Sequence, residues 1–409
     1  MSNNFRSRLV DYCRIDNAKL IEIIDLGLHP YADTFIGSTQ LNLAEPLFPL
    51  VCMLCPECGL VQLKYETQDY ERYNLYAYSY TSSNSDFSRS HWNDFAKYAV
   101  ETSAKPIRNV VEIGSNDGYL LKQFHTKAVK VLGVDSSLEM ATMANSKGID
   151  TLHAVFNHES SHQVLDMMGE VDLVIANNVL NHANNPLSFL EGISDIMSKN
   201  GRFIFEVPYW KDTINSLHFD QIYHEHVTYF TSQSIEKLLK SAGLSVTDIS
   251  VVNYHGGSLR VTAVKATKHK AIAPLGSLID GEYRDGLFEV ETYRQYVSAL
   301  KKNRNLFLMN IHQLMTESPK TPIAGIGAAA KANTLLTFYG LNNTYLKFVA
   351  DSSSHKIGKY TPFTRIPICE DNEFKKYDKI YALVLSWNIG ETLRTSIRAI
   401  NSKVEFLKL

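Results

Sequence analysis

Apolar and polar residues alternate along the middle of the chain as they do where strands and helices follow one another. An apolar run at 109–113 leads into a glycine-containing loop at 114–118, a helical pattern at 119–125 and a second apolar run at 129–134, which ends at Asp135. Short apolar runs bounded by glycine predict buried strands, and a helical period between two of them predicts a crossover. The segment is therefore predicted to be a β-loop-α-β unit of a parallel sheet.

The same alternation continues to about residue 266 and predicts the rest of a sheet. A helix at 186–198 and a strand at 202–207 are separated by Lys199-Asn200-Gly201, a sequence typical of a helix end. The last two predicted strands, 245–252 and 258–266, are expected to close the doubly wound sheet as an antiparallel pair. The other predicted elements are strands near 151 and at 171–177, and helices at 86–100, 138–146, 158–168 and 232–241.

Beyond residue 267, a helical stretch at about 286–316 leads to a second strand and glycine loop at 322–331. A strand at 346–350 ends at Asp351, and another lies at 379–385. This order predicts a second, smaller Rossmann-like unit. The chain is therefore predicted to be an α/β protein with a small amino-terminal domain at 1–66, a central domain at 67–266 and a carboxyl-terminal domain at 267–409.

Composition and charge exclude several classes of protein. A chain of 409 residues is too long for one ordinary core, which agrees with two or three domains. Its net charge of −2 provides no basic field for nucleic acid or an anionic membrane. Residues 1–10 have no apolar core, and the longest apolar runs, at 171–176 and 380–387, are too short to span a membrane. A cytoplasmic protein, monomeric or homodimeric, is expected.

Four of the five cysteines lie in the first 58 residues, which indicates a metal site rather than a disulfide framework. Cys55-Pro56-Glu57-Cys58-Gly59 is a tight turn that brings two thiolates together, which is half of a tetrahedral zinc site. Cys13 could supply a third thiolate, and Asp16 stands where its partner is expected. Cys52 has apolar neighbours that predict a packed strand. The alternatives are a reduced site without metal and a zinc ribbon that reads nucleic acid, although no basic patch accompanies the turn.

The two glycine loops favour different ligands. In the first loop, Asn116 and Asp117 place an amide and a carboxylate where a pyrophosphate would bind, so the cationic S-adenosylmethionine suits it better than NAD. Asp135, at the end of the next strand, could accept hydrogen bonds from ribose hydroxyls. In the second loop, Lys331 could hold a diphosphate and Asp351 a ribose. The alternative for the second loop is a turn that only packs a helix on a strand.

The stretch from Tyr223 to Phe230 concentrates polar chemistry behind the predicted strand 202–207. It holds two imidazoles, one carboxylate and two phenols within eight residues. Such side chains at the carboxyl end of a strand can move a proton and hold a developing negative charge. A polar loop with satisfied hydrogen bonds is the alternative, and metal chelation by His224 and His226 lacks the His-Glu-x-x-His spacing.

The ordered set of motifs resembles the nucleotide-sugar C-methyltransferases, over nearly the whole chain. The set comprises Cys-x-x-Cys-Gly, then Glu112-Ile113-Gly114-Ser115-Asn116-Asp117-Gly118, Tyr223-His224-Glu225-His226, Tyr254-His255-Gly256-Gly257 and Gly-x-Gly-Ala-x-Ala-Lys. The resemblance implies a class I S-adenosylmethionine-dependent methyltransferase core between a zinc domain and a Rossmann-like domain. It also implies methyl transfer to carbon, typically C3 of a dTDP-linked 4-keto-deoxysugar, in branched deoxysugar biosynthesis.

The resemblance carries over to particular residues. His226 matches the expected base, with Tyr223 and Glu225 beside it, and His182 matches a histidine that faces the sugar. The candidate cofactor-binding residues are Glu112, Gly114, Asn116, Gly118, Asp135, Phe156 and Asn178. The candidate substrate-binding residues are Tyr76, Tyr78, Tyr254, Lys331 and Asn388, and the candidate zinc ligands are Cys13, Asp16, Cys55 and Cys58.

Two positions depart from the family pattern: Asp16 replaces a cysteine, and Phe363 follows Pro362 where glycine is usual. Carbon methylation next to a ketone requires a base for the α-proton and a donor to the enolate oxygen. His226 is expected to be that base, and Tyr223 or His182 the donor. The alternatives are methylation at oxygen or nitrogen of a nucleotide sugar, an NAD-dependent sugar oxidoreductase, and a non-catalytic sugar-nucleotide binder.

Overall fold

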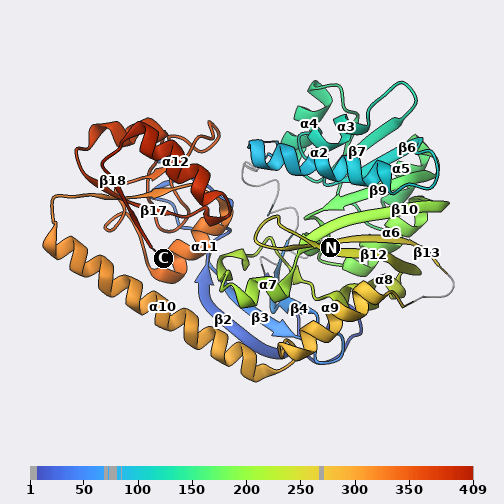
Figure 1. The fold of residues 1–409 in the computed structure, drawn as a ribbon, viewed down its shortest axis with the longest axis horizontal. Helices are drawn as coiled ribbons and strands as arrows, with labels where there is room; N and C mark the ends of the chain where they lie inside the picture. Colours follow the sequence, from blue (N-terminus) through green and yellow to red (C-terminus); the bar gives the residue numbers. More distant parts are fainter. Residues whose placement is uncertain (1–6, 69–71, 73–80, 84, 267–270, 409) are drawn as a thin grey trace.

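The computed structural model describes residues 7–68, 72, 81–83, 85–266 and 271–408. Within these residues the strands form four sheets. Figure 1 shows two lobes, one cyan to green and one orange to red, and the blue strands of a third sheet below and between them. The predicted α/β fold class, with a Rossmann-like central sheet, a cysteine-bearing amino-terminal part and a second parallel sheet, is confirmed.

The central sheet has the strand order β12-β13-β10-β9-β6-β7-β8. The strands β6 to β10 run parallel, while β13 is antiparallel to both β10 and β12. The predicted antiparallel pair therefore closes the sheet. The seven strands are β6 (Asn109–Ile113), β7 (Lys130–Asp135), β8 (Thr151–His153), β9 (Val171–Asn177), β10 (Met197–Pro208), β12 (Leu244–Val252) and β13 (Ser258–Lys265).

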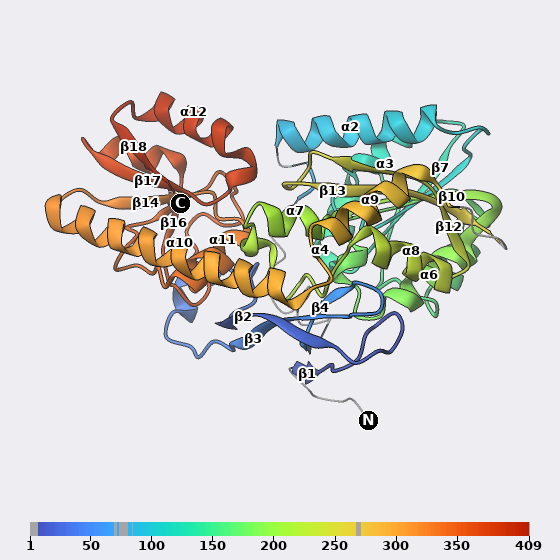
Figure 2. The ribbon, with the colours of Figure 1, turned by 60° about the horizontal axis from the view of Figure 1, so that its bottom comes forward.

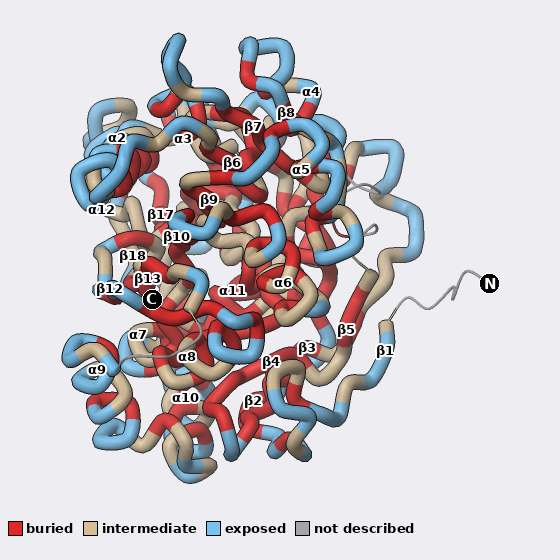
Figure 3. The backbone as a smooth tube through the Cα atoms, turned by 90° about the vertical axis from the view of Figure 1, so that its right-hand side faces the viewer, coloured by how far each residue is buried: buried red, intermediate tan, exposed pale blue. Residues whose placement is uncertain are grey.

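Helices cover both faces of this sheet, which explains the continuous apolar run of its central strand. Val110 of β6 packs into a core with Trp92 and Phe95, whereas Val111 and Ile113 pack into a core on the other face. The helices around the sheet are α2 (Asp86–Glu101), α3 (Tyr119–Phe124), α4 (Leu138–Ser146), α5 (Ser161–Met168), α6 (Pro186–Ile196) and α8 (Ser232–Ser241). Figure 3 shows the buried strands enclosed by partly exposed helices.

The amino-terminal sheet has the order β11-β4-β3-β2 and is antiparallel. Its strands are β2 (Ile21–His29), β3 (Phe48–Leu54), β4 (Val61–Leu63) and β11 (Thr228–Tyr229), and a separate pair joins β1 (Ser7–Leu9) to β5 (Tyr65–Thr67). Strand β11 belongs to the Tyr223–Phe230 stretch, so this stretch is bonded directly into the amino-terminal sheet. Cys52 lies fully buried on β3, which confirms the predicted packed strand.

The carboxyl-terminal sheet is parallel throughout, in the order β16-β15-β14-β17-β18. Its strands are β14 (Ile323–Ile326), β15 (Val349–Ala350), β16 (Ile368–Cys369), β17 (Ile380–Val384) and β18 (Val404–Leu407), with helices α11 (Ala330–Tyr339) and α12 (Gly390–Ile400). The predicted Rossmann-like unit is present, although β15 is shorter than the strand predicted at 346–350.

The connection between the two lobes differs from the prediction. Instead of one helical stretch at 286–316 after a short loop, the structure has α9 (Ala273–Arg284) and the long α10 (Val290–Glu317). Gly286 separates them with a φ of +68°, a left-handed conformation that a helix interior cannot contain. Figure 2 shows α10 along the base of the carboxyl-terminal lobe, and its Tyr293 and Leu300 share a core with residues of β2. A further short helix, α7 (Trp210–Asn215), follows β10.

Candidate active site

One cavity of about 400 Å³ lies where the carboxyl ends of the two parallel sheets meet. The loops after β6, β7 and β9 line one side, and the loops after β14, β15 and β17 line the other. The predicted site residues that line it are Glu112, Gly114, Asn116, Asp135, Phe156, Asn178, His182, Tyr223, Glu225, His226, Lys331 and Asn388. Most of the residues predicted from separate motifs are thus brought to a single space.

The loop after β6 is held in a conformation that requires glycine. Gly114 has a φ of +69°, and a Cβ placed on it would lie 2.3 Å from Val179 Cγ2. Asp135, at the end of β7, accepts hydrogen bonds from the backbone N–H groups of Asn116 and Ser137, both at 2.8 Å. These bonds fix the carboxylate beside the loop, and each oxygen keeps a second lone pair for a ribose hydroxyl.

The carboxyl groups of Glu112 and Asp135 line this side of the cavity and give it an acidic character. Glu112 is buried, and its Oε2 has no hydrogen-bond partner among the described residues. Burial raises the pKa of Glu112 well above its usual range, and the nearby Asp117 and Asp135 raise it further. A buried carboxyl oxygen without a hydrogen-bond partner is costly unless a cation or donor meets it. The loop therefore suits the ammonium and sulfonium of S-adenosylmethionine and not a pyrophosphate.

Asp117 faces away from the cavity and fastens a neighbouring segment to the loop. Its carboxylate accepts hydrogen bonds from Ser82 Oγ at 2.6 Å, from Ser83 Oγ and from Lys147 Nζ at 3.0 Å. The backbone N–H of Ser82 also donates to Asn116 Oδ1 at 2.8 Å. Ser82 and Ser83 therefore attach their segment to the cofactor loop, and Ser82 also lines the cavity.

His226 lines the cavity together with Gln221 and Tyr223. Its Nδ1 lies 2.8 Å from the carbonyl oxygen of Gln221, and its Nε2 lies 2.7 Å from the hydroxyl of Tyr223. Burial lowers the pKa of His226 to about 4, so the ring is neutral at pH 7. The ring of His182 lies 4.9 Å from that of His226 and approaches it edge-on. Two neutral imidazoles and a phenol thus share one wall.

Glu225 lies beside this wall and is held from the amino-terminal domain. Its Oε1 accepts a hydrogen bond from the backbone N–H of Asp33 at 3.2 Å, whereas its Oε2 has no hydrogen-bond partner in the described part of the chain. Burial raises the pKa of Glu225 to about 7. His224 points elsewhere, against the rings of Tyr31 and Phe48. A shared metal on His224 and His226 is therefore not supported.

The loop after β14 repeats the geometry of the cofactor loop. Asp351 accepts hydrogen bonds from Ala328 N–H at 2.7 Å and Ser353 N–H at 2.8 Å, as Asp135 does from Asn116 and Ser137. Each aspartate begins an Asp-Ser-Ser sequence at the end of a parallel strand. The second loop is therefore built like a nucleotide loop, which weighs against the alternative of a turn that only packs a helix on a strand.

Lys331 gives the second loop a positive charge. Its Nζ donates to Asn388 Oδ1 and lies 4.2 Å from the centre of the Trp387 ring. Burial lowers the pKa of Lys331 to about 8, and the charge of Asp220 opposes that shift. Lys356, which also lines the cavity, donates to the Ala328 carbonyl at 2.8 Å. Two lysines thus face the cavity from the carboxyl-terminal sheet.

Two predicted site residues lie behind the cavity wall. Gly118 does not line the cavity; its φ of +77° begins α3, and a Cβ there would meet Ile149 at 3.1 Å. Tyr254 is buried, with its ring stacked on His91 at 3.9 Å, and its neighbour His255 lines the cavity instead. The structure therefore does not bring either residue to the cavity lining, and their contact with a ligand stays a prediction. Tyr76 and Tyr78 lie outside the described residues.

Other lining residues were not found from the sequence. Among them are Asp33, Gln221, His255 and Lys356. The signal for His255 was present, because it stands in the Tyr-His-Gly-Gly motif, and Gln221 stands two residues before Tyr223. Nothing in the local sequence indicated Asp33, which reaches the cavity from the amino-terminal domain.

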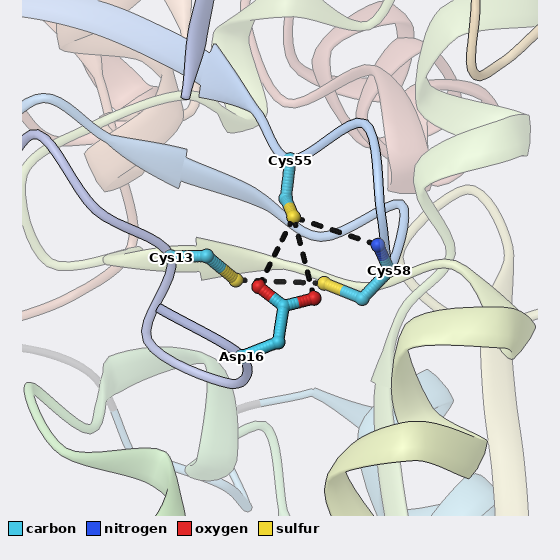
Figure 4. Close-up of side chains that lie close together, drawn as sticks. All are labelled: Cys13, Asp16, Cys55 and Cys58. Carbon is cyan, nitrogen blue, oxygen red and sulfur yellow. Dashed lines mark hydrogen bonds between the residues drawn. The ribbon is translucent and has the colours of Figure 1, made fainter. Parts of the chain in front are cut away.

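The four predicted metal ligands also meet. Figure 4 shows Cys13, Asp16, Cys55 and Cys58 converging from two loops, and their ligand atoms lie within 4.8 Å of one another. Three thiolates and a carboxylate are a donor set that suits tetrahedral Zn²⁺. The cluster therefore fits the metal that the sequence predicts.

The two loops of this cluster have matching backbones. Asn17 N–H donates to the Cys13 carbonyl and Gly59 N–H to the Cys55 carbonyl, both at 3.0 Å. Both donors have a positive φ, +60° for Asn17 and +73° for Gly59. Asp16 thus occupies the place in the first loop that Cys58 occupies in the second, which supports it as the fourth ligand.

Comparison with known families decides the class. A family model of the C-methyltransferase C-terminal domain matches residues 253–407, a methyltransferase domain model matches 87–249, and a zinc binding domain model matches 13–73. The chain belongs to the S-adenosylmethionine-dependent C-methyltransferases. This confirms the family that the motifs resemble, with S-adenosylmethionine and zinc as the expected cofactors.

Individual proteins and solved structures are similar to this chain. Over 404 residues the chain is 29% identical to the C-methyltransferase NovU of Streptomyces niveus, an alignment that covers 98% of this chain and 94% of NovU. Solved structures that it resembles include magnesium protoporphyrin IX methyltransferase from Synechocystis with bound SAM, at 16% identity and a TM-score of 0.34 over 44% of this chain and 79% of the other. Another is an S-adenosylmethionine-dependent methyltransferase from Clostridium acetobutylicum, at 14% identity and a TM-score of 0.34 over 44% and 93%.

Among the described helices of this C-methyltransferase, none combines the length and the apolar character that a membrane span would need.

Proposed function

We propose that this C-methyltransferase methylates a carbon next to the ketone of a nucleotide-linked 4-keto-deoxysugar, at C3, in branched deoxysugar biosynthesis. The observation that carries the proposal is that one cavity is shared by an acidic glycine loop, an imidazole–phenol pair, and a second glycine loop with Lys331, which Lys356 joins from the loop after β15. The acidic loop suits a sulfonium donor, and the imidazole–phenol pair suits proton transfer. The lysine-bearing side suits a diphosphate.

His226 is the proposed base. The Gln221 carbonyl can only accept a hydrogen bond, so Nδ1 of His226 carries the proton and Nε2 is free to accept one. Tyr223, which donates to Nε2 in this structure, turns its hydroxyl to the ketone oxygen when the sugar binds. Nε2 then takes the α-proton, and the electron pair of the C–H bond forms the enolate.

Tyr223 and His182 are the proposed donors to the enolate oxygen. Both line the cavity next to His226, and burial lowers the pKa of His182 well below its usual range, so His182 donates as a neutral ring. S-adenosylmethionine supplies the electrophilic methyl group, and its sulfur leaves as a neutral thioether when the carbon takes the methyl. The ketone re-forms as the carbon–carbon bond is made, so the product keeps its carbonyl group.

The carboxyl-terminal domain is the proposed holder of the nucleotide. Lys331 and Lys356 neutralise the diphosphate, Asp351 accepts from the ribose, and Asn388 orients Lys331. Glu225 accepts a hydroxyl of the sugar through its unpaired oxygen. The domain boundaries near residues 66 and 266, the dTDP nucleotide, the cytoplasmic location and the monomeric or homodimeric state stay predictions.

A deuterium experiment tests the reaction. The purified protein is incubated in D₂O with dTDP-, GDP-, CDP- and UDP-linked 4-keto sugars, with and without S-adenosylmethionine, and the products are read by mass. We expect one substrate to exchange an α-proton for deuterium without the donor and to gain a methyl on carbon with it. Methyl transfer without any exchange at the α-carbon would contradict the enolate route and favour methylation at oxygen or nitrogen.

A further inference from the structure

Arg14 stands inside the first metal loop, between the ligands Cys13 and Asp16. Its backbone N–H donates to Gln62 Oε1 at 3.0 Å, and Gln62 Nε2 donates to the Tyr12 carbonyl at 3.2 Å. The side chain is 7% exposed and lies 2.7 Å from Glu66 Oε2. A buried arginine in a loop whose two ends bind a metal has its position set by that metal.

The guanidinium of Arg14 makes a second contact besides the one with Glu66. Its NH1 group donates to the backbone carbonyl of Asn184, which lies 170 residues further along the chain. Asn184 belongs to the turn after β9 that carries His182 and Ala183 into the cavity. The metal loop therefore contacts the backbone of the turn that bears a proposed enolate donor.

A second arginine completes this attachment. Arg72 donates to Asn184 Oδ1 at 2.9 Å and to the His182 carbonyl at 3.3 Å. It also donates to the Thr67 carbonyl at 2.7 Å, next to β5 and Glu66. On its other side the turn is bonded by Val227 N–H to the Asn181 carbonyl at 2.8 Å. The turn is thus held between the amino-terminal domain and the His226 stretch.

We propose that Arg14 is a positioning residue that couples the metal site to His182. Cys13 and Asp16 would be fixed by the metal that they hold and would fix Arg14 between them; Arg14 in turn fixes the Asn184 carbonyl and with it the turn that places the His182 ring 4.9 Å from His226. The metal then acts on catalysis through geometry and without touching the substrate. The inference rests on the proposed function because it takes His182 as a donor at the reacting sugar.

Arg14→Gln tests the coupling, with Arg8→Gln as the matched control. Arg8 also pairs with Glu66, at 2.7 Å, but its side chain is 60% exposed, whereas that of Arg14 is 7% exposed. We expect Arg14→Gln to lower kcat at least about tenfold, because a displacement of about 1 Å at a reacting group can cost about 100-fold. Zinc content and the Kd for S-adenosylhomocysteine are expected to stay within twofold, and Arg8→Gln to keep kcat within twofold.

Chelation of the metal distinguishes coupling from a general structural role. In the wild type we expect zinc removal to lower kcat about as much as Arg14→Gln does, and to shift the imidazole resonances of His182. In Arg14→Gln, zinc removal is expected to change kcat less than twofold further. Equal effects of chelation in both proteins, or an unshifted His182 signal in the chelated wild type, would overturn the proposal.

Two further variants keep these outcomes separate from folding and from the proposed function. Arg14→Lys retains a buried charge but not the planar fork, so it is expected to fold while kcat still falls. His182→Asn tests the donor itself. If His182→Asn retains full turnover, the proposed role of His182 fails; if it is inactive while Arg14→Gln is fully active, only the coupling fails.

Discussion

The Nε2 atom of His226 lies 2.7 Å from the hydroxyl oxygen of Tyr223. Because Nδ1 is bonded to the Gln221 carbonyl, the phenol is the donor and the imidazole the acceptor in this contact. The pair is therefore set with the accepting nitrogen toward the cavity. The imidazole of His226 is neutral at pH 7 because burial lowers its pKa to about 4.

Replacement of His226 by asparagine should abolish most turnover while the fold and the cofactor site remain. Base catalysis contributes about 10²–10⁴-fold, so kcat is expected to fall at least ~100-fold. The Kd for S-adenosylhomocysteine, measured by calorimetry, should change little because the contacts of His226 are with Tyr223, Gln221 and His182 and the glycine loop is expected to hold the cofactor. Turnover within tenfold of the wild type would remove His226 from the role of base. Tyr223→Phe is the companion variant, expected to lower kcat by about 10²–10³-fold.

Glu112 should make cofactor binding depend on pH. In the free protein, burial raises the pKa of Glu112, and a bound cation stabilises the carboxylate and lowers that pKa again. Binding therefore releases a proton below the raised pKa, and the affinity for S-adenosylhomocysteine rises with pH until that pKa is passed. Calorimetry in buffers of different ionisation enthalpy measures the released proton. Glu112→Gln should bind S-adenosylhomocysteine about tenfold more weakly, and its affinity should no longer rise with pH. An unchanged pH dependence in the variant would assign the released proton to another group.

Asp16 should make the metal site weaker than a site with four thiolates. A thiolate is a softer ligand than a carboxylate and suits Zn²⁺ better, so Asp16→Cys should retain zinc against a higher concentration of chelator. Asp16→Ala should lose zinc at a lower concentration than the wild type. Asp11→Ala, an exposed acid outside the cluster, is the control and should match the wild type. Metal content, measured by mass spectrometry at each chelator concentration, gives the order of zinc affinity among these proteins. If Asp16→Ala retained zinc as well as the wild type does, Asp16 would not be a ligand.

Much of this site could be predicted because its signals are local in the sequence. Gly114, Asp135 and His226 each stand at a position relative to a predicted strand that determines where its backbone lies. The central sheet then brings them together, since the carboxyl ends of parallel strands meet at one edge. Even the metal cluster followed from the spacing within each loop, with Asp16 three residues after Cys13.

The parts that could not be predicted depend on long-range packing or on side-chain direction. Arg14 and Asn184 are 170 residues apart, and no local pattern connects them. Tyr254 and His255 are neighbours, and the left-handed backbone at His255, with a φ of +51°, decides which of them faces the cavity. The pattern of apolar residues indicates which residues are buried and whether a segment is a helix or a strand. The conformation of such turns depends instead on tertiary packing.

Glycine at position 363 should be more stable than alanine at the same position. Its φ of +59° lies in the left-handed region, where a side chain costs about 1–2 kcal/mol relative to glycine, and its backbone N–H is bonded to Glu45 Oε2 at 2.7 Å. We expect Phe363→Gly to be more stable than Phe363→Ala by about 1 kcal/mol in the free energy of unfolding. Alanine is the proper reference because it also removes the ring but keeps the strain. Equal denaturant midpoints for the two variants would indicate that the loop relaxes out of this conformation.

Lys331 should set both the affinity for the nucleotide sugar and its dependence on pH. Burial lowers the pKa of Lys331 to about 8 in the free protein, and a bound diphosphate favours the charged form and raises that pKa. Affinity is therefore constant below pH 8 and falls above it, because the free lysine must then take up a proton on binding. The KM for the sugar nucleotide should rise by up to about tenfold between pH 8 and pH 9.

Lys331→Met removes the charge and should raise that KM by about 10- to 100-fold at pH 7, with no further rise from this group above pH 8. The Kd for S-adenosylhomocysteine should stay unchanged, since the cofactor loop belongs to the other sheet. Lys347→Met, an exposed lysine on the same lobe that does not line the cavity, is the matched control and should leave KM unchanged. If Lys331→Met keeps the wild-type KM, the diphosphate lies elsewhere, and the second glycine loop serves only to pack α11 on β14.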